Sequence, residues 1–124
     1  MLFKILPYIN QPLIILGFIV FAIIPLLFSL AFHEMSHGFV AYKFGDITPK
    51  IMGRLTLNPF KHLDKAGTIC LLLFGLGWAK PVMINPNNIP NSTQRMLVAL
   101  AGPLSNTFLA VVFASIMAFI KNYY

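Results

Sequence analysis

Long uncharged stretches dominate the pattern of hydrophobic and polar positions along the chain. No charged residue occurs between Lys4 and Glu34, and Ser29 is the one hydrogen-bonding side chain within residues 12–32. At 1.5 Å per residue, these 21 residues form a helix of about 32 Å, which matches a bilayer core of about 30 Å. The pattern predicts a transmembrane helix that Pro25 can kink. A signal peptide is the alternative, although the apolar run is longer than a usual signal-peptide core.

The polar pattern predicts the end of this helix and the next two elements. Helical character continues past the apolar run and is predicted to stop at Gly45-Asp46, with Lys43 in the last turn. Residues 54–58 (RLTLN) alternate between polar and apolar, which predicts a short strand or hairpin. Residues 66–79 are apolar but reach only about 21 Å as a helix, so they form either a short span or a re-entrant segment.

The last third of the chain repeats the apolar pattern. Residues 80–95 are rich in proline and asparagine and are predicted to form a loop, whereas residues 96–120 contain no charge and form a second long span. The predicted fold class is an all-α polytopic membrane protein with two long transmembrane helices, one short spanning or re-entrant segment and a strand-like hairpin. Residues 1–124 are expected to form a single membrane-embedded core.

Composition and charge agree with a multi-pass membrane protein, which we expect in the cell membrane. Only 10% of the residues are charged, against about 25% in soluble domains. The net charge of +6 would suggest a nucleic-acid partner in a soluble chain, but the basic residues lie between apolar spans and no nucleic-acid-binding module is present. The loop after the first long helix is predicted to be cytoplasmic because it is rich in basic residues, namely Lys43, Lys50, Arg54, Lys61 and Lys65.

Candidate chemistry is concentrated in residues 33–37, which read His-Glu-Met-Ser-His. His33 and His37 are four residues apart, so on a helix both imidazoles lie on one face and can reach one Zn²⁺. Glu34, the only glutamate in the chain, is placed as a general base for water rather than as a ligand. The alternative is that these groups mark a helix end at the membrane interface. Apolar residues resume at Phe39, however, and ionisable groups at membrane depth usually serve a function.

Four ordered segments resemble the site-2 protease family of intramembrane zinc metalloproteases. They are HEMSH at 33–37, GRLTLNPFKHLDKAGTI at 53–69, GWAKPVMINP at 77–86 and AGPLSN at 101–106. The resemblance implies a zinc metalloendopeptidase that hydrolyses peptide bonds of membrane-embedded substrates in regulated intramembrane proteolysis. Its partners would be a transmembrane protein substrate, membrane lipid and an upstream protease of site-1 type that makes the first cut.

The resemblance also implies roles for individual residues. His33 and His37 would bind zinc, and Glu34 would act as the general base. Asn106 would hold the substrate strand or stabilise an oxyanion, and its alternative role is a hydrogen bond between helices. Gly102 and Pro103 are expected to permit close packing and a local break in the helix.

A third zinc ligand is missing from this pattern. The family takes it from an aspartate on a later helix, and no matching motif occurs in the sequence. Asp64 is a weak candidate because no glycine follows it, whereas His62 is expected to be a solvated loop residue and Cys70 a small buried one. We therefore expect the amino-terminal part of a longer protease, inactive alone. The alternative is a non-catalytic truncated remnant or pseudoprotease that binds membrane partners.

Overall fold

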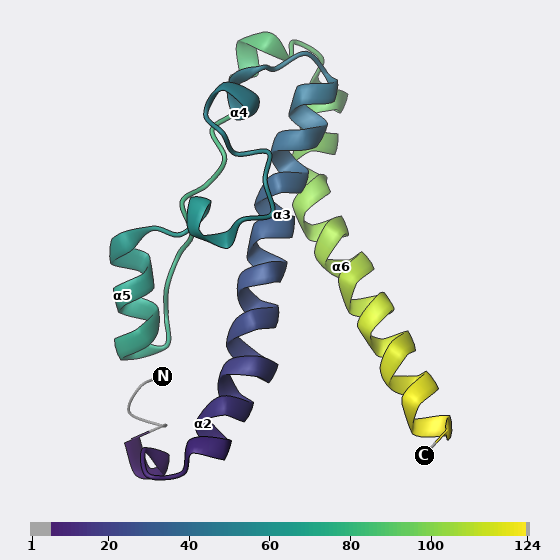
Figure 1. Ribbon diagram of the computed structural model, residues 1–124. Coiled ribbons are helices and arrows are strands. Elements are labelled where there is room, and N and C mark those ends of the chain that lie inside the picture. Colours follow the sequence, from purple (N-terminus) through teal and green to yellow (C-terminus); the bar gives the residue numbers. More distant parts are fainter. Residues whose placement is uncertain (1–5, 124) are drawn as a thin grey trace.

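Two long helices that cross near one end organise the chain (Figure 1). The structure is a computed structural model and describes residues 6–123. Its elements, in chain order, are η1 (Leu6–Tyr8), α2 (Pro12–Phe18), the π-helical η2 (Ile19–Ile23), α3 (Ile24–Lys43), α4 (Thr48–Ile51), η3 (Pro59–Lys61), α5 (Lys65–Phe74), η4 (Pro86–Asn88) and α6 (Ser92–Tyr123).

The first long helix runs from Pro12 to Lys43 through α2, η2 and α3. Pro25 stands in the first turn of α3, directly after the π-helical turn η2. Proline cannot donate the backbone hydrogen bond of an α-helix, so a local change of helix type accommodates it. This helix and α6 are each long and apolar enough to cross a membrane, as the sequence predicts.

The end of α3 is confirmed at the predicted position. Phe44 donates its backbone N–H to the carbonyl of Val40 at 3.1 Å, and Gly45 then adopts a φ of 103°. This left-handed conformation favours glycine, and it lets Asp46 donate its N–H back to the carbonyl of Ala41 at 3.0 Å. The chain therefore turns sharply at the end of α3.

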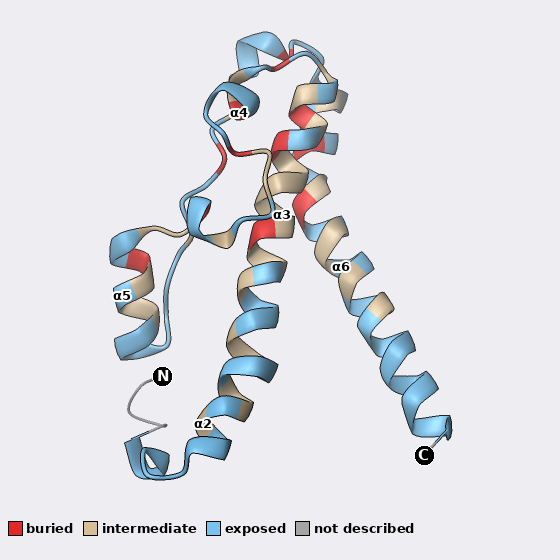
Figure 2. Cartoon of the chain, viewed as in Figure 1, coloured by how far each residue is buried: buried red, intermediate tan, exposed pale blue. Residues whose placement is uncertain are grey.

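Helices α3 and α6 pack closely only around their crossing. Figure 2 shows the buried positions of both helices gathered there, while their distant ends carry exposed positions. Four of the five buried residues of the two helices are small; the five are Ala31, Gly38 and Ala41 of α3 with Val98 and Gly102 of α6. Gly102 lies directly against the imidazoles of α3, so its lack of a side chain lets the two helices approach, whereas Gly38 packs against the loop residues Leu55 and Val82. The exposed apolar ends suit a lipid environment.

The strand-like hairpin expected at residues 54–58 is not found; the structure has a loop there. Asn58 donates its N–H to the Thr56 hydroxyl at 3.1 Å, and its own side chain accepts from the N–H of Phe60 at 3.0 Å. The Arg54 guanidinium donates to the Lys61 carbonyl. These local bonds occupy the groups that a strand ladder would need. In residues 6–123, β pairing is limited to one isolated bridge between Leu63 and Ala79.

The third apolar segment leaves the rest of the fold and returns to where it started. Helix α5 has 10 residues, about 15 Å, which is too short for a bilayer. The chain reverses at Gly75, whose φ is 81°. The bridge from Leu63 to Ala79 then closes the segment, and we call residues 63–79 the excursion. A straight crossing by this segment is not found, and its re-entry into a membrane stays a prediction.

A buried carboxylate holds the segment that leads into α6. Asp46 is fully buried, and its two carboxylate oxygens accept four hydrogen bonds. Thr48 donates two of them, from its backbone N–H at 3.0 Å and from its hydroxyl at 2.6 Å. The other two come from the backbone N–H of Asn85 at 2.7 Å and from the side-chain amide of Asn88 at 2.9 Å. Burial acts to raise the pKa of Asp46, but these hydrogen bonds outweigh it and lower the pKa below its ordinary value. We call this group the Asp46 clasp.

Helix α6 begins four residues before the apolar pattern that predicts it. Asn91 accepts the backbone N–H of Thr93 with its side chain at 2.8 Å, which caps the helix. The helix then runs from Ser92 to Tyr123 with Pro103 inside it. The local break expected near Pro103 is therefore not found.

Candidate metal centre

His33 and His37 face each other on α3, as their spacing predicts. Their Nε2 atoms are 3.1 Å apart, and the two rings meet edge to face with centroids 4.7 Å apart. In a tetrahedral zinc site with Zn–N bonds of about 2.05 Å, two nitrogen ligands lie about 3.3 Å apart. The observed separation fits two ligands of one zinc ion.

Gly102 of α6 leaves the space that such an ion would need. A Cβ atom built on Gly102 would fall 2.6 Å from Nε2 and 2.7 Å from Cε1 of His33, and closer still to Nε2 of His37. Those distances are far below ordinary contact, so the missing side chain keeps a space open between α6 and both Nε2 atoms. The close packing expected at Gly102 is confirmed, and this cradle fits a metal ion.

The other nitrogen of each imidazole is held by α6. His37 donates from Nδ1 to the backbone carbonyl of Val98 at 2.7 Å, because a carbonyl can only accept. Its neutral ring then keeps a lone pair on Nε2, which is the form that binds metal. Nδ1 of His33 lies 3.1 Å from the amide nitrogen of Asn106, and the amide oxygen of Asn106 accepts from the hydroxyl of Ser29 at 3.0 Å.

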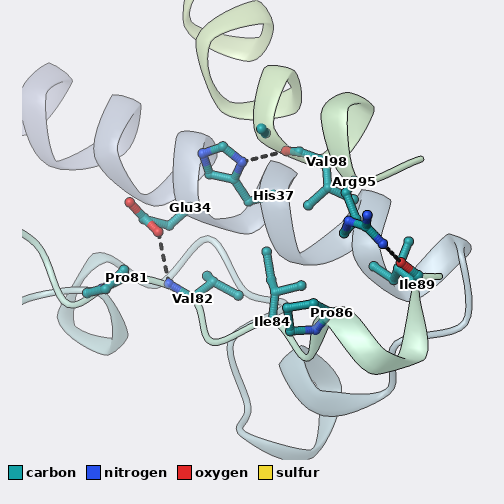
Figure 3. Close-up of a pocket in the computed structure, with 10 residues that line it drawn as sticks. Glu34, His37, Pro81, Val82, Ile84, Pro86, Ile89, Arg95 and Val98 are labelled. Atoms are coloured by element: carbon teal, nitrogen blue, oxygen red, sulfur yellow. Dashed lines mark hydrogen bonds between the residues drawn. The ribbon is translucent and has the colours of Figure 1, made fainter. Parts of the chain in front are cut away.

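Glu34 lies beside the histidines, at the wall of a cavity (Figure 3). Its Oε2 accepts the backbone N–H of Val82 at 3.0 Å. The Val82 side chain is buried against Gly38, whose hypothetical Cβ would lie 3.2 Å from it. The cavity has a volume of about 350 Å³, and Glu34, His37 and Arg95 are the charged or titratable members of its otherwise apolar lining.

The weaker ligand candidates lie elsewhere in the fold. Asp64 caps α5, because its Oδ1 accepts the N–H of Gly67 at 2.8 Å. His62 is fully buried, so the expectation of a solvated loop histidine is wrong; its Nε2 lies 2.8 Å from the carbonyl of Thr56. Cys70 is half-buried on α5. Among residues 6–123, no three His, Cys, Asp or Glu side chains are placed to hold one metal ion.

The sequence reasoning missed several groups of the site. The carbonyl of Val98 and the N–H of Val82 are backbone groups. Every residue type other than proline carries both groups, so the sequence does not indicate which of them reach the site. Ser29 is the exception, since it is the one polar side chain of a long apolar run. Asn106 lies where the resemblance places it, next to a zinc-ligand candidate, and its contact with substrate stays a prediction.

Comparison with known proteins identifies the family. The profile of peptidase family M50 matches residues 21–123, so the chain belongs to this family, the site-2 protease family. Two relatives both carry the name "Putative zinc metalloprotease". YwhC of Bacillus subtilis is 48% identical over 93 residues, which cover 74% of this chain and 42% of YwhC. Rip2 of Mycolicibacterium smegmatis is 33% identical over 107 residues, which cover 82% of this chain and 41% of Rip2.

The chain spans about two fifths of the length of these curated relatives. Rip2 of Mycobacterium tuberculosis gives the same proportion, with 35% identity over 107 residues that cover 82% of this chain and 41% of that protein. No solved structure matches the chain at a significant level. Family membership and two long apolar helices together indicate a membrane protein of the peptidase class.

Proposed function

We propose that this chain carries the zinc-binding and general-base part of an intramembrane metalloendopeptidase of site-2 type. The observation that supports it best is the pair of Nε2 atoms 3.1 Å apart, on a helix long enough to span a membrane, with Glu34 beside them. The two histidines supply two ligands, and catalytic zinc sites use three protein ligands. The proposal therefore includes a third ligand from outside the described residues.

Glu34 would carry the protons of the reaction. Bound zinc would supply Lewis-acid polarisation of the scissile carbonyl and a lowered pKa for water. The Val82 N–H holds one carboxylate oxygen of Glu34 and leaves the other free to accept a proton from water as the water attacks the carbonyl. Glu34 then delivers this proton to the leaving amine as the C–N bond breaks.

The apolar cavity next to Glu34 supports a substrate rich in hydrophobic residues. Its walls include Val82, Ile84, Ile89 and Val98, which suit an apolar side chain of a transmembrane segment. We propose a transmembrane protein as substrate, membrane lipid as the surroundings and a site-1-type protease that cuts first. The protein would be multi-pass and would lie in the cell membrane.

The decisive experiment replaces the base while keeping its shape. In the natural full-length protein, Glu34→Gln is expected to retain zinc, measured by metal analysis, and to lower the cleavage of a transmembrane substrate by at least about 100-fold. Ser115→Ala is the matched control, since Ser115 is an exposed residue of α6 that bonds only the Val111 carbonyl. Full turnover by the Glu34→Gln protein would refute the general-base role.

A further inference from the structure

The segment that carries the N–H of Val82 has no regular secondary structure. Residues 80–85 run from the bridge at Ala79 to the short helix η4, outside any helix or strand. A segment of this kind makes no ladder of hydrogen bonds within itself, so its backbone groups find partners elsewhere in the fold. Those partners determine where the segment lies. We call residues 80–85 the connecting segment.

Hydrogen bonds attach the connecting segment at both ends. The backbone N–H of Lys80 donates to the carbonyl of His62 at 2.8 Å. At the other end, the backbone N–H of Asn85 donates to Oδ2 of Asp46 at 2.7 Å. His62 and Asp46 are both fully buried, so both attachment points belong to the packed part of the fold.

The bond in the middle of the connecting segment leaves little room for movement. Val82 donates its N–H to Oε2 of Glu34 at 3.0 Å, and a bond of this kind is lost beyond about 3.5 Å. A displacement of about 0.5 Å is therefore enough to free the proposed general base. Val82 lies three residues before Asn85, and three residues of chain reach at most about 11 Å. The attachment at Asn85 therefore limits where the N–H of Val82 can lie.

Asp46 is a firm attachment point because it is tied to the end of α3. Its backbone N–H donates to the carbonyl of Ala41 at 3.0 Å. Its Oδ1 accepts three hydrogen bonds, two from Thr48 and one from the amide of Asn88. Its Oδ2 accepts the fourth, from Asn85. One carboxylate oxygen thus holds Asp46 in place, and the other holds the connecting segment.

We propose that Asp46 is a positioning residue for the general base, because it holds the connecting segment where the N–H of Val82 meets Glu34. The inference rests on the proposed function and extends it to a residue twelve positions after Glu34 that is not part of the cavity wall. Glu34 lies on α3, and Asp46 is bonded to the end of the same helix. The connecting segment is therefore bonded to one rigid helix at two points, and the loss of the second point lets it pivot about the first.

Asp46→Asn removes this attachment selectively. An asparagine side chain has one acceptor oxygen and one NH₂ group, which only donates. If the oxygen keeps the three bonds of Oδ1, the NH₂ group must face the N–H of Asn85, and two donors cannot bond each other. The variant therefore keeps most of the Asp46 clasp and loses the bond to the connecting segment.

The first measurement is turnover of the natural full-length protein at saturating substrate. It is made at a temperature where thermal unfolding in detergent shows every variant to be folded. We expect Asp46→Asn to lower turnover at least about threefold, because the Val82 N–H no longer holds Glu34 in place. Zinc affinity, measured by competition with a chelator, should stay within about twofold of the wild type, since neither histidine contacts the connecting segment through a hydrogen bond.

A double-mutant cycle with Val82→Pro shows whether Asp46 acts through the Val82 N–H. Val82→Pro removes that N–H, so nothing remains for Asp46 to position. In the Val82→Pro background, Asp46→Asn should then change turnover by less than about twofold. Independent effects would instead multiply, and a full multiplication would overturn the proposal.

Thr48→Val is the matched control for lost stability. It keeps the shape of the side chain and removes the hydroxyl that donates to Oδ1 of Asp46 at 2.6 Å, but it leaves the bond from Asn85 to Oδ2 in place. We expect its unfolding temperature to fall and its turnover to stay within about twofold of the wild type. The proposal fails if Thr48→Val loses as much turnover as Asp46→Asn, or if Asp46→Asn keeps the turnover of the wild type.

Amide hydrogen exchange tests the attachment without a catalytic assay. Exchange over residues 80–85 should be at least about tenfold faster in Asp46→Asn than in the wild type and in Thr48→Val. Equal exchange in all three proteins would overturn the proposal even if turnover falls. A wild type that cleaves substrate, together with Asp46→Asn at full turnover, would remove the positioning role alone. A wild type that cleaves no substrate would remove the proposed function and, with it, the positioning of a base.

Discussion

Replacing Gly102 with alanine tests whether the space beside the two imidazoles is a metal cradle. The new Cβ would lie 2.6 Å from Nε2 of His33, about 0.8 Å short of ordinary contact, which begins at 3.4 Å. Zinc–nitrogen bonds tolerate deviations of only about 0.2 Å. Since the helix backbones are packed at this point, the rings must move by more than the metal geometry allows. We expect zinc affinity to fall at least about tenfold, the lower bound for disturbing the support of a ligand.

The same substitution has a second expected effect, on the free energy of unfolding. Adding a methyl group to a packed position costs about 1–3 kcal/mol, whereas alanine is favoured over glycine within a helix by about 0.5–1 kcal/mol. Gly17→Ala is the matched control, because Gly17 is also helical and a Cβ built there meets nothing within 4 Å. Chelator competition gives the zinc affinity of both variants, and thermal unfolding in detergent gives their stability.

Only a selective loss of zinc supports the cradle. If Gly102→Ala binds zinc within twofold of the wild type, the space between α6 and the imidazoles is not where the metal sits. If Gly17→Ala loses zinc to the same extent, the effect comes from the glycine-to-alanine change itself and not from the site.

Two further substitutions test the segment that crosses the site. Val82→Pro removes the N–H that holds Glu34, so we expect turnover to fall at least tenfold while zinc affinity stays unchanged. Val82→Ala is the control because it keeps the N–H. An equal loss of turnover in Val82→Ala would exclude the hydrogen bond as the cause. Asp46→Asn should lower the free energy of unfolding at pH 7 by about 1–3 kcal/mol, because a neutral amide cannot accept every bond of the Asp46 clasp. The pKa of Asp46 is lowered by folding, so its stabilisation is present above the unfolded pKa of about 3.9 and is lost as pH falls through the folded pKa. The difference between wild type and Asp46→Asn, measured by thermal unfolding, should therefore shrink below about pH 4, and a constant difference would contradict this account.

The parts of the site that lie on one helix are readable from the sequence. His33 and His37 depend on a spacing of four residues, and helical geometry brings them together whatever else the chain does. The end of α3 is equally local, because Gly45 alone supplies the left-handed turn. Both long helices are predicted correctly for the same reason, since their apolar length is a property of a continuous segment.

The contacts made across the crossing are not readable in this way. Val98, Gly102 and Asn106 reach the imidazoles only because α6 crosses α3 at one particular height, and nothing within either segment fixes that height. The expected hairpin fails for a different reason. Residues 54–58 alternate between polar and apolar as a strand does, and this alternation led to the prediction. In the structure, the side chains of Thr56 and Asn58 instead accept hydrogen bonds from nearby backbone N–H groups, which favours a loop.

The two ends of the excursion are paired with each other, so the number of residues between them does not affect the position of the site. The backbone N–H of Lys80 donates to the carbonyl of His62 at 2.8 Å, next to the bridge between Leu63 and Ala79. These bonds fix the position of Lys80 whatever the length of the chain between the paired residues. Lys80 lies two residues before Val82, whose N–H holds Glu34. Lengthening a loop between fixed ends costs little, because closure entropy grows only with the logarithm of its length. A change in the length of the excursion should therefore leave the Val82 N–H in the same place beside Glu34.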